Sequence, residues 1–269
     1  MRHSDEEPAE LARELHLARG GHRLLDAGRT GTALSPERAY TVQDELTALR
    51  LAEGRCPVGY KLGYTSAVMR QQMGVPAPNY GPLLDDMVLR TGAVATGFLQ
   101  PRVEPEIGVV LARDLAGTGF LLSELADAVR SVHACLEIVD SVWHSYRFSA
   151  DQNTADGSSA AGVVLGPALD VSPVDCHRIT VALAENETVV ATATTAAVGG
   201  HPLHSLAWLA AALAARGKSL SRGELVITGG LTAAVPLRPG ATISARFGRA
   251  VEVSVHRPAH AVDAQPPLG

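Results

Sequence analysis

The sequence changes from helical to strand-like periodicity near residue 56, and this change limits the folds open to the chain. Before it, Ser35 and Pro36 mark the start of a helix whose apolar residues recur at helical spacing until Gly54. After it, over residues 58–114, short apolar runs alternate with glycine and proline, which is typical of strands joined by loops. Regular alternation of strands and helices is missing, as is a glycine-rich nucleotide motif. The pattern predicts an α+β fold with antiparallel or mixed sheets.

The 269 residues divide into three expected parts. Residues 1–56 are expected to form an N-terminal helical cap, with Ser4 and Glu7 as a capping box at its start. The first helix of the cap is expected to present an apolar face made of Leu11, Leu15 and Leu17. Residues 57–257 are expected to form the catalytic domain, and residues 258–269, rich in proline and alanine, a disordered tail.

Further elements are predicted beyond residue 114. One helix is expected over residues 121–134, followed by a short buried strand over residues 136–139. A hairpin is expected around Asn186, and an alanine- and leucine-rich helix over residues 204–216. Three more strands are expected over residues 225–227, 242–247 and 251–255.

Composition excludes several classes of protein. The net charge of -5 argues against a nucleic-acid partner, because a protein that binds nucleic acid normally has a basic surface. The three cysteines are far apart and lack the spacing of a disulfide framework or a zinc site. The N-terminus is acidic without an apolar core, unlike a signal peptide, and no apolar run is long enough to span a membrane. We therefore expect a cytoplasmic protein with no membrane partner.

Two closely spaced acids are the sharpest chemical feature. Glu104 and Glu106 are two positions apart in a strand-like segment, so their side chains would project from the same face and repel. Glu137 stands alone inside another apolar run. Three converging carboxylates would suit Mg²⁺ or Mn²⁺. The alternative is that Glu104 and Glu106 pair with Arg102 and another base on an exposed edge.

Lys61 lies in a glycine-flanked apolar segment, residues 58–63. A buried lysine there could bind a carboxylate or transfer a proton, whereas an edge-strand lysine would lie in solvent. Asp156, followed by Gly157, is most simply a turn residue. The ten histidines show no metal-binding spacing, and neither a G-x-S-x-G motif nor a motif around a cysteine supports a serine or cysteine hydrolase.

Eight segments, taken in order, resemble the hydratase/decarboxylase branch of the fumarylacetoacetate hydrolase superfamily. This branch comprises 2-hydroxypentadienoate hydratases and 2-oxo-3-hexenedioate (4-oxalocrotonate) decarboxylases. The resemblance runs from about Ala39 to Val255. The segments are GYKLGYTS at 59–66, QMGV at 72–75, YGPL at 80–83, PRVEPE at 101–106, LEIVDS at 136–141, AD at 155–156, GHPL at 200–203 and TGG at 228–230.

The resemblance implies a fold and a set of site residues. The implied fold is a mixed β-roll behind a small N-terminal α/β cap. The family is usually assembled as homo-oligomers, and its decarboxylase–hydratase pairing implies a partner pathway enzyme. The implied ligands of a divalent cation are Glu104, Glu106 and Glu137. The implied catalytic residues are Lys61, Asp156 and Ser159, and the implied substrate-binding residues are Lys61, Asn79, Leu83 and Ser159.

The resemblance also implies a reaction. We expect a metal-dependent lyase that decarboxylates 2-oxo-3-hexenedioate, or a related 2-oxo diacid, through a metal-stabilised dienolate. Hydration of 2-hydroxypenta-2,4-dienoate is the alternative, because Asn79 replaces both the acidic residue usual in hydratases and the aliphatic residue of decarboxylases. Val142 and Gly157 replace the family's arginine and asparagine, which points to an unusual substrate.

Two other functions remain open on the sequence. An acylpyruvate-type C–C hydrolase would need a base, commonly a histidine, but no histidine lies between His22 and His133. A non-catalytic partner subunit is the other, and the presence of all three glutamates and the lysine argues against it.

Overall fold

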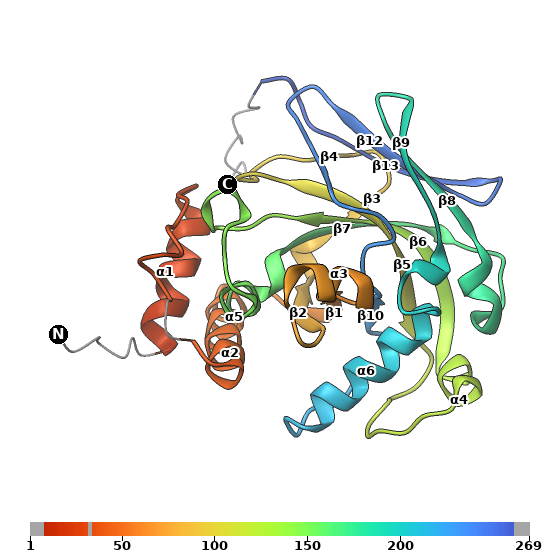
Figure 1. The fold of residues 1–269 in the computed structure, drawn as a ribbon, viewed down its shortest axis with the longest axis horizontal. Coiled ribbons are helices and arrows are strands. Elements are labelled where there is room, and N and C mark those ends of the chain that lie inside the picture. Colours follow the sequence, from red (N-terminus) through yellow and green to blue (C-terminus); the bar gives the residue numbers. More distant parts are fainter. Residues whose placement is uncertain (1–7, 32–33, 261–269) are drawn as a thin grey trace.

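The computed structural model describes residues 8–31 and 34–260 (Figure 1). The expected capping box of Ser4 and Glu7 lies outside the described residues, as do residues 261–269 of the expected tail. Across the described part of the chain, none of the helices combines the length and the apolar character needed to cross a bilayer.

An eight-stranded mixed sheet forms the centre of the molecule. Its strands run in the order β2-β1-β10-β5-β6-β7-β3, and β11 pairs with β5. The pairs β1–β10 and β3–β7 are parallel, and the other pairs are antiparallel. The strands are β1 (Pro57–Gly63), β2 (Asn79–Leu84), β3 (Val88–Arg90), β5 (Arg102–Leu111), β6 (Val129–Val139), β7 (Ala160–Ala168), β10 (Leu225–Ile227) and β11 (Val235–Pro236).

A five-stranded sheet, in the order β4-β13-β12-β8-β9, lies across the upper part of the view in Figure 1. Within this sheet, β4 and β13 pair in parallel, and the other pairs are antiparallel. The strands are β4 (Ala93–Val94), β8 (Thr180–Glu185), β9 (Thr188–Thr194), β12 (Thr242–Phe247) and β13 (Val251–His256). The hairpin around Asn186 and the strands expected near the C-terminus are therefore present.

The two faces of the large sheet have different surroundings. On β5, Val103, Ile107 and Val109 belong to the main hydrophobic core, together with residues of β12, β13 and helix α6 (Pro202–Ala214). Because neighbouring residues of a strand face opposite ways, Glu104 and Glu106 project from the other face. That face carries a smaller apolar cluster, made of Leu83, Val110, Cys135, Val163, Leu225 and Ile227.

The cap consists of α1 (Pro8–Gly20) and α2 (Pro36–Ala52), on the left in Figure 1. Ser35 caps α2 as expected, since its Oγ accepts a hydrogen bond from the N–H of Arg38 at 3.3 Å. The cap shares a hydrophobic core with the residues that follow β6 and with α5 (Ala150–Ala155). This core contains Leu11, Leu15, Val42, Val142, Trp143 and Ala155. The boundary expected at residue 56 remains a prediction.

Short helices connect the strands. Those in α-conformation are α3 (Ala67–Met73) and α4 (Leu122–Asp127). Those with 3₁₀ geometry are η1 (Asp85–Met87), η2 (His144–Tyr146), η3 (Gly157–Ser159), η4 (Pro173–Arg178) and η5 (Thr195–Ala197).

Two local predictions were wrong. The helix expected over residues 121–134 ends at Asp127, and residues from Val129 onward form β6. Apolar residues at 129 and 132 fit a helix, but the segment pairs with β5 and β7, and residues 134–139 are buried on both faces of the sheet. Leu17, expected on the buried face of α1, is 67% exposed.

The burial of α1 yields a stability prediction. Leu15 is 1% exposed and Leu17 is 67% exposed. We expect Leu15→Ala to lower the free energy of unfolding by about 2–4 kcal/mol, because it leaves a cavity in the core of the cap. Leu17→Ala should change it by less than about 0.5 kcal/mol. Urea unfolding of both variants checks this, and equal losses would contradict the assigned face.

Candidate active site

Three carboxylates come together on one face of the large sheet. Glu104 and Glu106 lie on β5, and Glu137 lies on β6 directly opposite Glu104. Each offers one oxygen atom, and these atoms lie within 4.8 Å of one another. The spacing of two along β5 thus brings both of its acids beside Glu137.

Pairing of these acids with bases on an exposed sheet edge is excluded. β5 lies between β10 and β6, in the interior of the sheet. Glu106 and Glu137 are 0% and 1% exposed. Arg102, the expected partner on such an edge, instead places its guanidinium carbon 4.2 Å from the centre of the Tyr146 ring.

The buried carboxylates have too few hydrogen-bond donors. Oε2 of Glu106 accepts from the backbone N–H of Gly229 at 2.7 Å. Oε1 of Glu106 and Oε2 of Glu137 have no hydrogen-bond donor among the described residues, whereas Oε1 of Glu137 has Lys61 as an ion-pair partner. Burial, and after it repulsion from Glu137, raises the pKa of Glu104 to about 7 and that of Glu106 well above its ordinary range. Unpartnered buried oxygens of this kind fit a divalent cation, which prefers carboxylate ligands.

Lys61 lies beside this cluster and is 3% exposed. Its strand β1 lies between β2 and β10, so a solvent-exposed edge position is excluded. Its Nζ lies 3.0 Å from Oε1 of Glu137 and donates a hydrogen bond to the carbonyl oxygen of Ser158 at 2.9 Å. Burial alone would lower the pKa of Lys61, but attraction to Glu137, Glu106 and Glu104 outweighs it and raises the pKa above its ordinary value. The lysine is therefore positively charged.

A buried hydrogen-bond network joins Lys61 to Asn79 and Ser159. Oδ1 of Asn79 accepts from Oγ of Ser158 at 2.8 Å, and Nδ2 of Asn79 donates to Oδ1 of Asn153 at 3.0 Å. Nδ2 of Asn153 donates to Oγ of Ser159 at 2.8 Å. Ser158 and Asn153 are the members that sequence reasoning missed. Ser158 is next to Ser159 and Asn153 is three residues before Asp156, but nothing in the sequence shows that their side chains turn toward β1 and β2.

Glycines allow the segment Gly157–Ser159 to approach the sheet. A Cβ atom on Gly63 would lie 2.7 Å from Oγ of Ser158, and a Cβ on Gly81 would collide with the carbonyl group of Gly157. Gly63 and Gly81 lie on β1 and β2, on the same face as Lys61. The glycines of the GYKLG and YGPL segments therefore leave room for the backbone that binds the lysine.

Asp156 has a different environment from the carboxylate cluster. Its Oδ1 lies 2.9 Å from Nη2 of Arg19, and its Oδ2 accepts from the N–H of Val142 at 3.1 Å and from Oγ of Ser141 at 3.3 Å. Burial raises the pKa of Asp156, and Arg19 opposes that shift. Both oxygens are thus occupied by groups that connect α1 to the residues after β6. Its expected catalytic role remains a prediction.

The departures at positions 142 and 157 have structural explanations. The side chain of Val142 is buried in the core of the cap rather than beside the carboxylates. Gly157 has a φ of 65°, a left-handed conformation that glycine adopts freely and that asparagine tolerates better than most residues. Leu83, in contrast, lies on the face of β2 that carries Asn79 and contributes to the apolar cluster beside the site.

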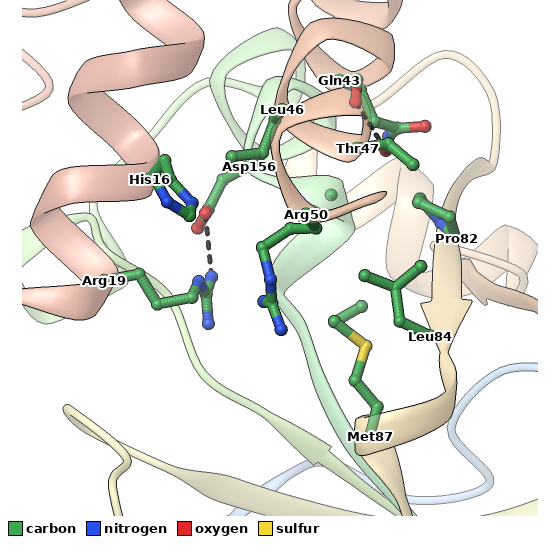
Figure 2. Close-up of a pocket in the computed structure, with 12 residues that line it drawn as sticks. His16, Arg19, Gln43, Leu46, Thr47, Arg50, Pro82, Leu84, Met87 and Asp156 are labelled. Carbon is green, nitrogen blue, oxygen red and sulfur yellow. Dashed lines mark hydrogen bonds and ion pairs between the residues drawn. The ribbon is translucent and has the colours of Figure 1, made fainter. Parts of the chain in front are cut away.

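Figure 2 shows a cavity between the cap and the sheet, with Arg19 directed at Asp156. Gln43, Arg50, Pro82, Leu84 and Met87 are among its other lining residues. Its volume of about 40 Å³ is enough for a few water molecules but not for a six-carbon diacid. This cavity is therefore part of the contact between cap and sheet rather than a substrate pocket.

Comparison with known proteins identifies the family. The model of the family described as fumarylacetoacetate (FAA) hydrolase C-terminal matches residues 58–256. The chain belongs to this family. The α+β fold and the superfamily implied by the sequence motifs are thereby confirmed.

Individual members of the family are similar over most of the chain. A 4-oxalocrotonate decarboxylase of Pseudomonas putida is 36% identical over 212 residues, covering 78% of this chain and 80% of the relative. A 2-keto-4-pentenoate hydratase of Paraburkholderia xenovorans (strain LB400) is 35% identical over 236 residues, covering 86% and 87%. The solved structure of the 4-oxalocrotonate decarboxylase from Pseudomonas putida G7, complexed with magnesium and adipate, is 32% identical and superposes with a TM-score of 0.88 over 95% of this chain and 99% of that one.

The ion pair between Arg19 and Asp156 yields a second stability prediction. The side chain of Asp156 is 0% exposed and that of Arg19 is 24% exposed. We expect Arg19→Met to lower the free energy of unfolding at pH 7 by about 3 kcal/mol, because it leaves a buried charge without its partner. In the double variant with Asp156→Asn, the losses should be less than additive. A loss below about 0.5 kcal/mol in urea unfolding of Arg19→Met would show that the pair contributes nothing.

Proposed function

We propose that this protein is a divalent-metal-dependent lyase that decarboxylates 4-oxalocrotonate (2-oxo-3-hexenedioate) or a related unsaturated 2-oxo diacid. The observation that carries the proposal is the charged, buried Lys61 beside two buried carboxylates and one partly buried carboxylate, on a sheet face where position 79 carries a neutral amide. The similarity to a 4-oxalocrotonate decarboxylase over most of both chains supports it.

Glu104, Glu106 and Glu137 would hold Mg²⁺ or Mn²⁺. A bound divalent cation supplies Lewis acidity at the 1-carboxylate and 2-oxo oxygens of a 2-oxo acid. With that cation, the three glutamates and Lys61 sum to no net charge, so a negatively charged substrate meets no net repulsion there. The neighbouring apolar cluster that contains Leu83 would limit the access of water.

Lys61 would act on the substrate directly. Its ammonium group can bind the departing carboxylate and later donate a proton from Nζ to the carbon chain. Ser158 holds Nζ through its carbonyl oxygen, and Asn79 in turn holds Ser158. Asn79 and Ser159 would therefore contribute to substrate binding and orientation from the same network, while Asp156 would fix the segment that carries Ser159.

Hydration of 2-hydroxypenta-2,4-dienoate is the second candidate. The similarity to a 2-keto-4-pentenoate hydratase, at 35% identity over 86% of this chain, favours it. Hydration needs a group that takes a proton from water, and the amide of Asn79 is not basic enough to do so. This is the reason to place decarboxylation first. An acylpyruvate-type hydrolase and a non-catalytic partner subunit are further alternatives.

The resemblance to the family supports three additional proposals about cellular context. The protein would act in the cytoplasm, assemble as a homo-oligomer, and associate with a partner enzyme of the same pathway. Light scattering of the purified chain, alone and mixed with a pathway hydratase, tests the two assembly proposals.

Parallel assays of two substrates test the reaction. Purified protein with Mg²⁺ or Mn²⁺ is given either 4-oxalocrotonate, with CO₂ release followed, or 2-hydroxypenta-2,4-dienoate, with formation of 4-hydroxy-2-oxopentanoate followed. EDTA-sensitive CO₂ release would support the decarboxylase. Hydration without CO₂ release would move the assignment to the hydratase. Inactivity on both would reject both reactions.

Removal of one ligand should abolish the response to metal. Glu106→Gln keeps the shape of the side chain but removes a buried negative charge from the proposed ligand set. We expect the apo variant to fold, to show little or no thermal stabilisation by Mn²⁺, and to lose metal-dependent turnover. Differential scanning fluorimetry with and without Mn²⁺ measures the first two outcomes. Wild-type stabilisation in this variant would exclude Glu106 as a ligand.

The two lysines of the chain provide a matched pair for the catalytic proposal. We expect Lys61→Met to lower kcat/KM by about 10²–10⁴-fold, because it removes a proton donor and a carboxylate-binding charge. Lys218→Met, which removes a half-exposed lysine, should leave it within about twofold of wild type. Steady-state kinetics on the active substrate compare kcat/KM of the two variants. Equal changes in kcat/KM would show that Lys61 has no specific role in the reaction.

A further inference from the structure

Gln43 of the cap helix α2 is a buried polar residue outside the site described above. It ends the segment AYTVQ, where the family resemblance begins, and it is 2% exposed. Its Nε2 donates two hydrogen bonds, to the carbonyl oxygen of Tyr80 at 2.9 Å and to that of Thr154 at 2.7 Å. One amide group therefore connects two elements of the catalytic domain, β2 and α5.

The carbonyl group of Tyr80 depends on a donor from outside the sheet. β2 is an edge strand of the large sheet, so carbonyl groups on its outer side have no neighbouring strand to pair with. Tyr80 and Thr154 are 3% and 5% exposed, so water does not readily replace the amide. Tyr40, three residues before Gln43 on α2, stacks on the ring of Tyr80 at 4.7 Å and fixes the helix against the strand.

The same two elements carry the side chains that hold Ser158, whose carbonyl oxygen binds Lys61. Asn79 precedes Tyr80 on β2, and its Nδ2 donates to Oδ1 of Asn153 and, at 2.9 Å, to Oγ1 of Thr154, both on α5. Its Oδ1 accepts from Ser158, whose carbonyl oxygen accepts from Lys61. Gln43 and Asn79 thus join β2 to α5 at adjacent positions. The spacing that Gln43 sets is the spacing across which Asn79 reaches Asn153 and Thr154.

We propose that Gln43 is a positioning residue through which the helical cap holds Lys61 in place, by fixing the distance between β2 and α5. Its effect on turnover rests on the proposed function of Lys61, whereas its effect on the position and protection of Lys61 rests on the geometry alone. The cap would then be required for an ordered site although it contributes none of the proposed metal ligands and does not supply Lys61.

Selective labelling of amines tests the geometric part. The chain has two lysines, Lys61 and Lys218, of which the second is 43% exposed in its side chain. Full-length protein with Mg²⁺ is acetylated with sulfosuccinimidyl acetate beside a reference lysine peptide, and mass spectrometry follows each site. We expect Gln43→Met to raise the acetylation rate of Lys61 about tenfold, because two buried carbonyl groups lose their donor and the network opens more often. Gln43→Asn has a shorter side chain, whose amide cannot reach both carbonyl groups. It should raise the acetylation rate of Lys61 by a smaller factor, and it replaces Gln43→Met in the test if that variant does not fold.

Two controls separate positioning from general loss of stability. Thr47 lies one turn from Gln43 and lines the same cavity (Figure 2). Thr47→Ala removes a hydrogen bond that stays within α2, so Lys61 should remain protected from acetylation. Leu183→Ala lowers stability through the core under the second sheet, far along the chain from the cap. If Leu183→Ala exposes Lys61 as much as Gln43→Met does, or if no Gln43 variant exposes it, the proposal is overturned.

Kinetics test the functional part separately. On whichever substrate the wild type converts, Gln43→Met should lower kcat by about tenfold to a hundredfold, as a small misplacement of a reacting group does, with a smaller change in KM. Increased labelling without a fall in kcat would keep the geometric role and exclude Lys61 from the rate-limiting chemistry. Unchanged labelling with unchanged kcat would reject the positioning role itself.

Discussion

Repulsion among three converging carboxylates is the constraint on which the rest of the site depends. Glu104, Glu106 and Glu137 are fixed by the register of β5 and β6, so they cannot move apart without disrupting the centre of the sheet. Lys61 offsets part of their charge, and several of their oxygens remain without donors. The glycines that bring Ser158 close, and the network that holds Lys61, follow from the need to keep one cation fixed beside three anions.

The sequence predicted the carboxylate cluster better than its surroundings. A spacing of two within a strand determines which way Glu104 and Glu106 point, and an acid inside an apolar run, such as Glu137, rarely lacks a partner. The network around Lys61 was less accessible, because its members come from β1, β2, α5 and η3 and meet only after folding. Residues 129–134 show the same limit for the fold, since short apolar patterns fit a helix and a strand equally until the neighbours are known. Leu17 lies in the expected helix, but which face of that helix is buried depends on the elements that pack against it.

The cap has a larger part in the site than its position suggests. Arg19 on α1 holds Asp156, and Gln43 on α2 holds Tyr80 and Thr154, so both cap helices contact the segment that leads to Ser158 and Ser159. The shared hydrophobic core, which includes Val142 and Trp143, adds an apolar contact to these polar ones. The replacement of an arginine by Val142 therefore concerns how the cap packs, and its effect on substrate choice would be indirect.

The opposite surroundings of the two faces of β5 and β6 have an evolutionary consequence. Val103, Ile107 and Val109 maintain the hydrophobic core, while Glu104 and Glu106 on the opposite face carry charges of the site. Folding stability and chemistry are thus encoded at alternating positions of the same strands. Substitutions that adapt the site to a different 2-oxo acid can accumulate on one face without loosening the other, which allows a single scaffold to diversify in reaction while its core stays unchanged.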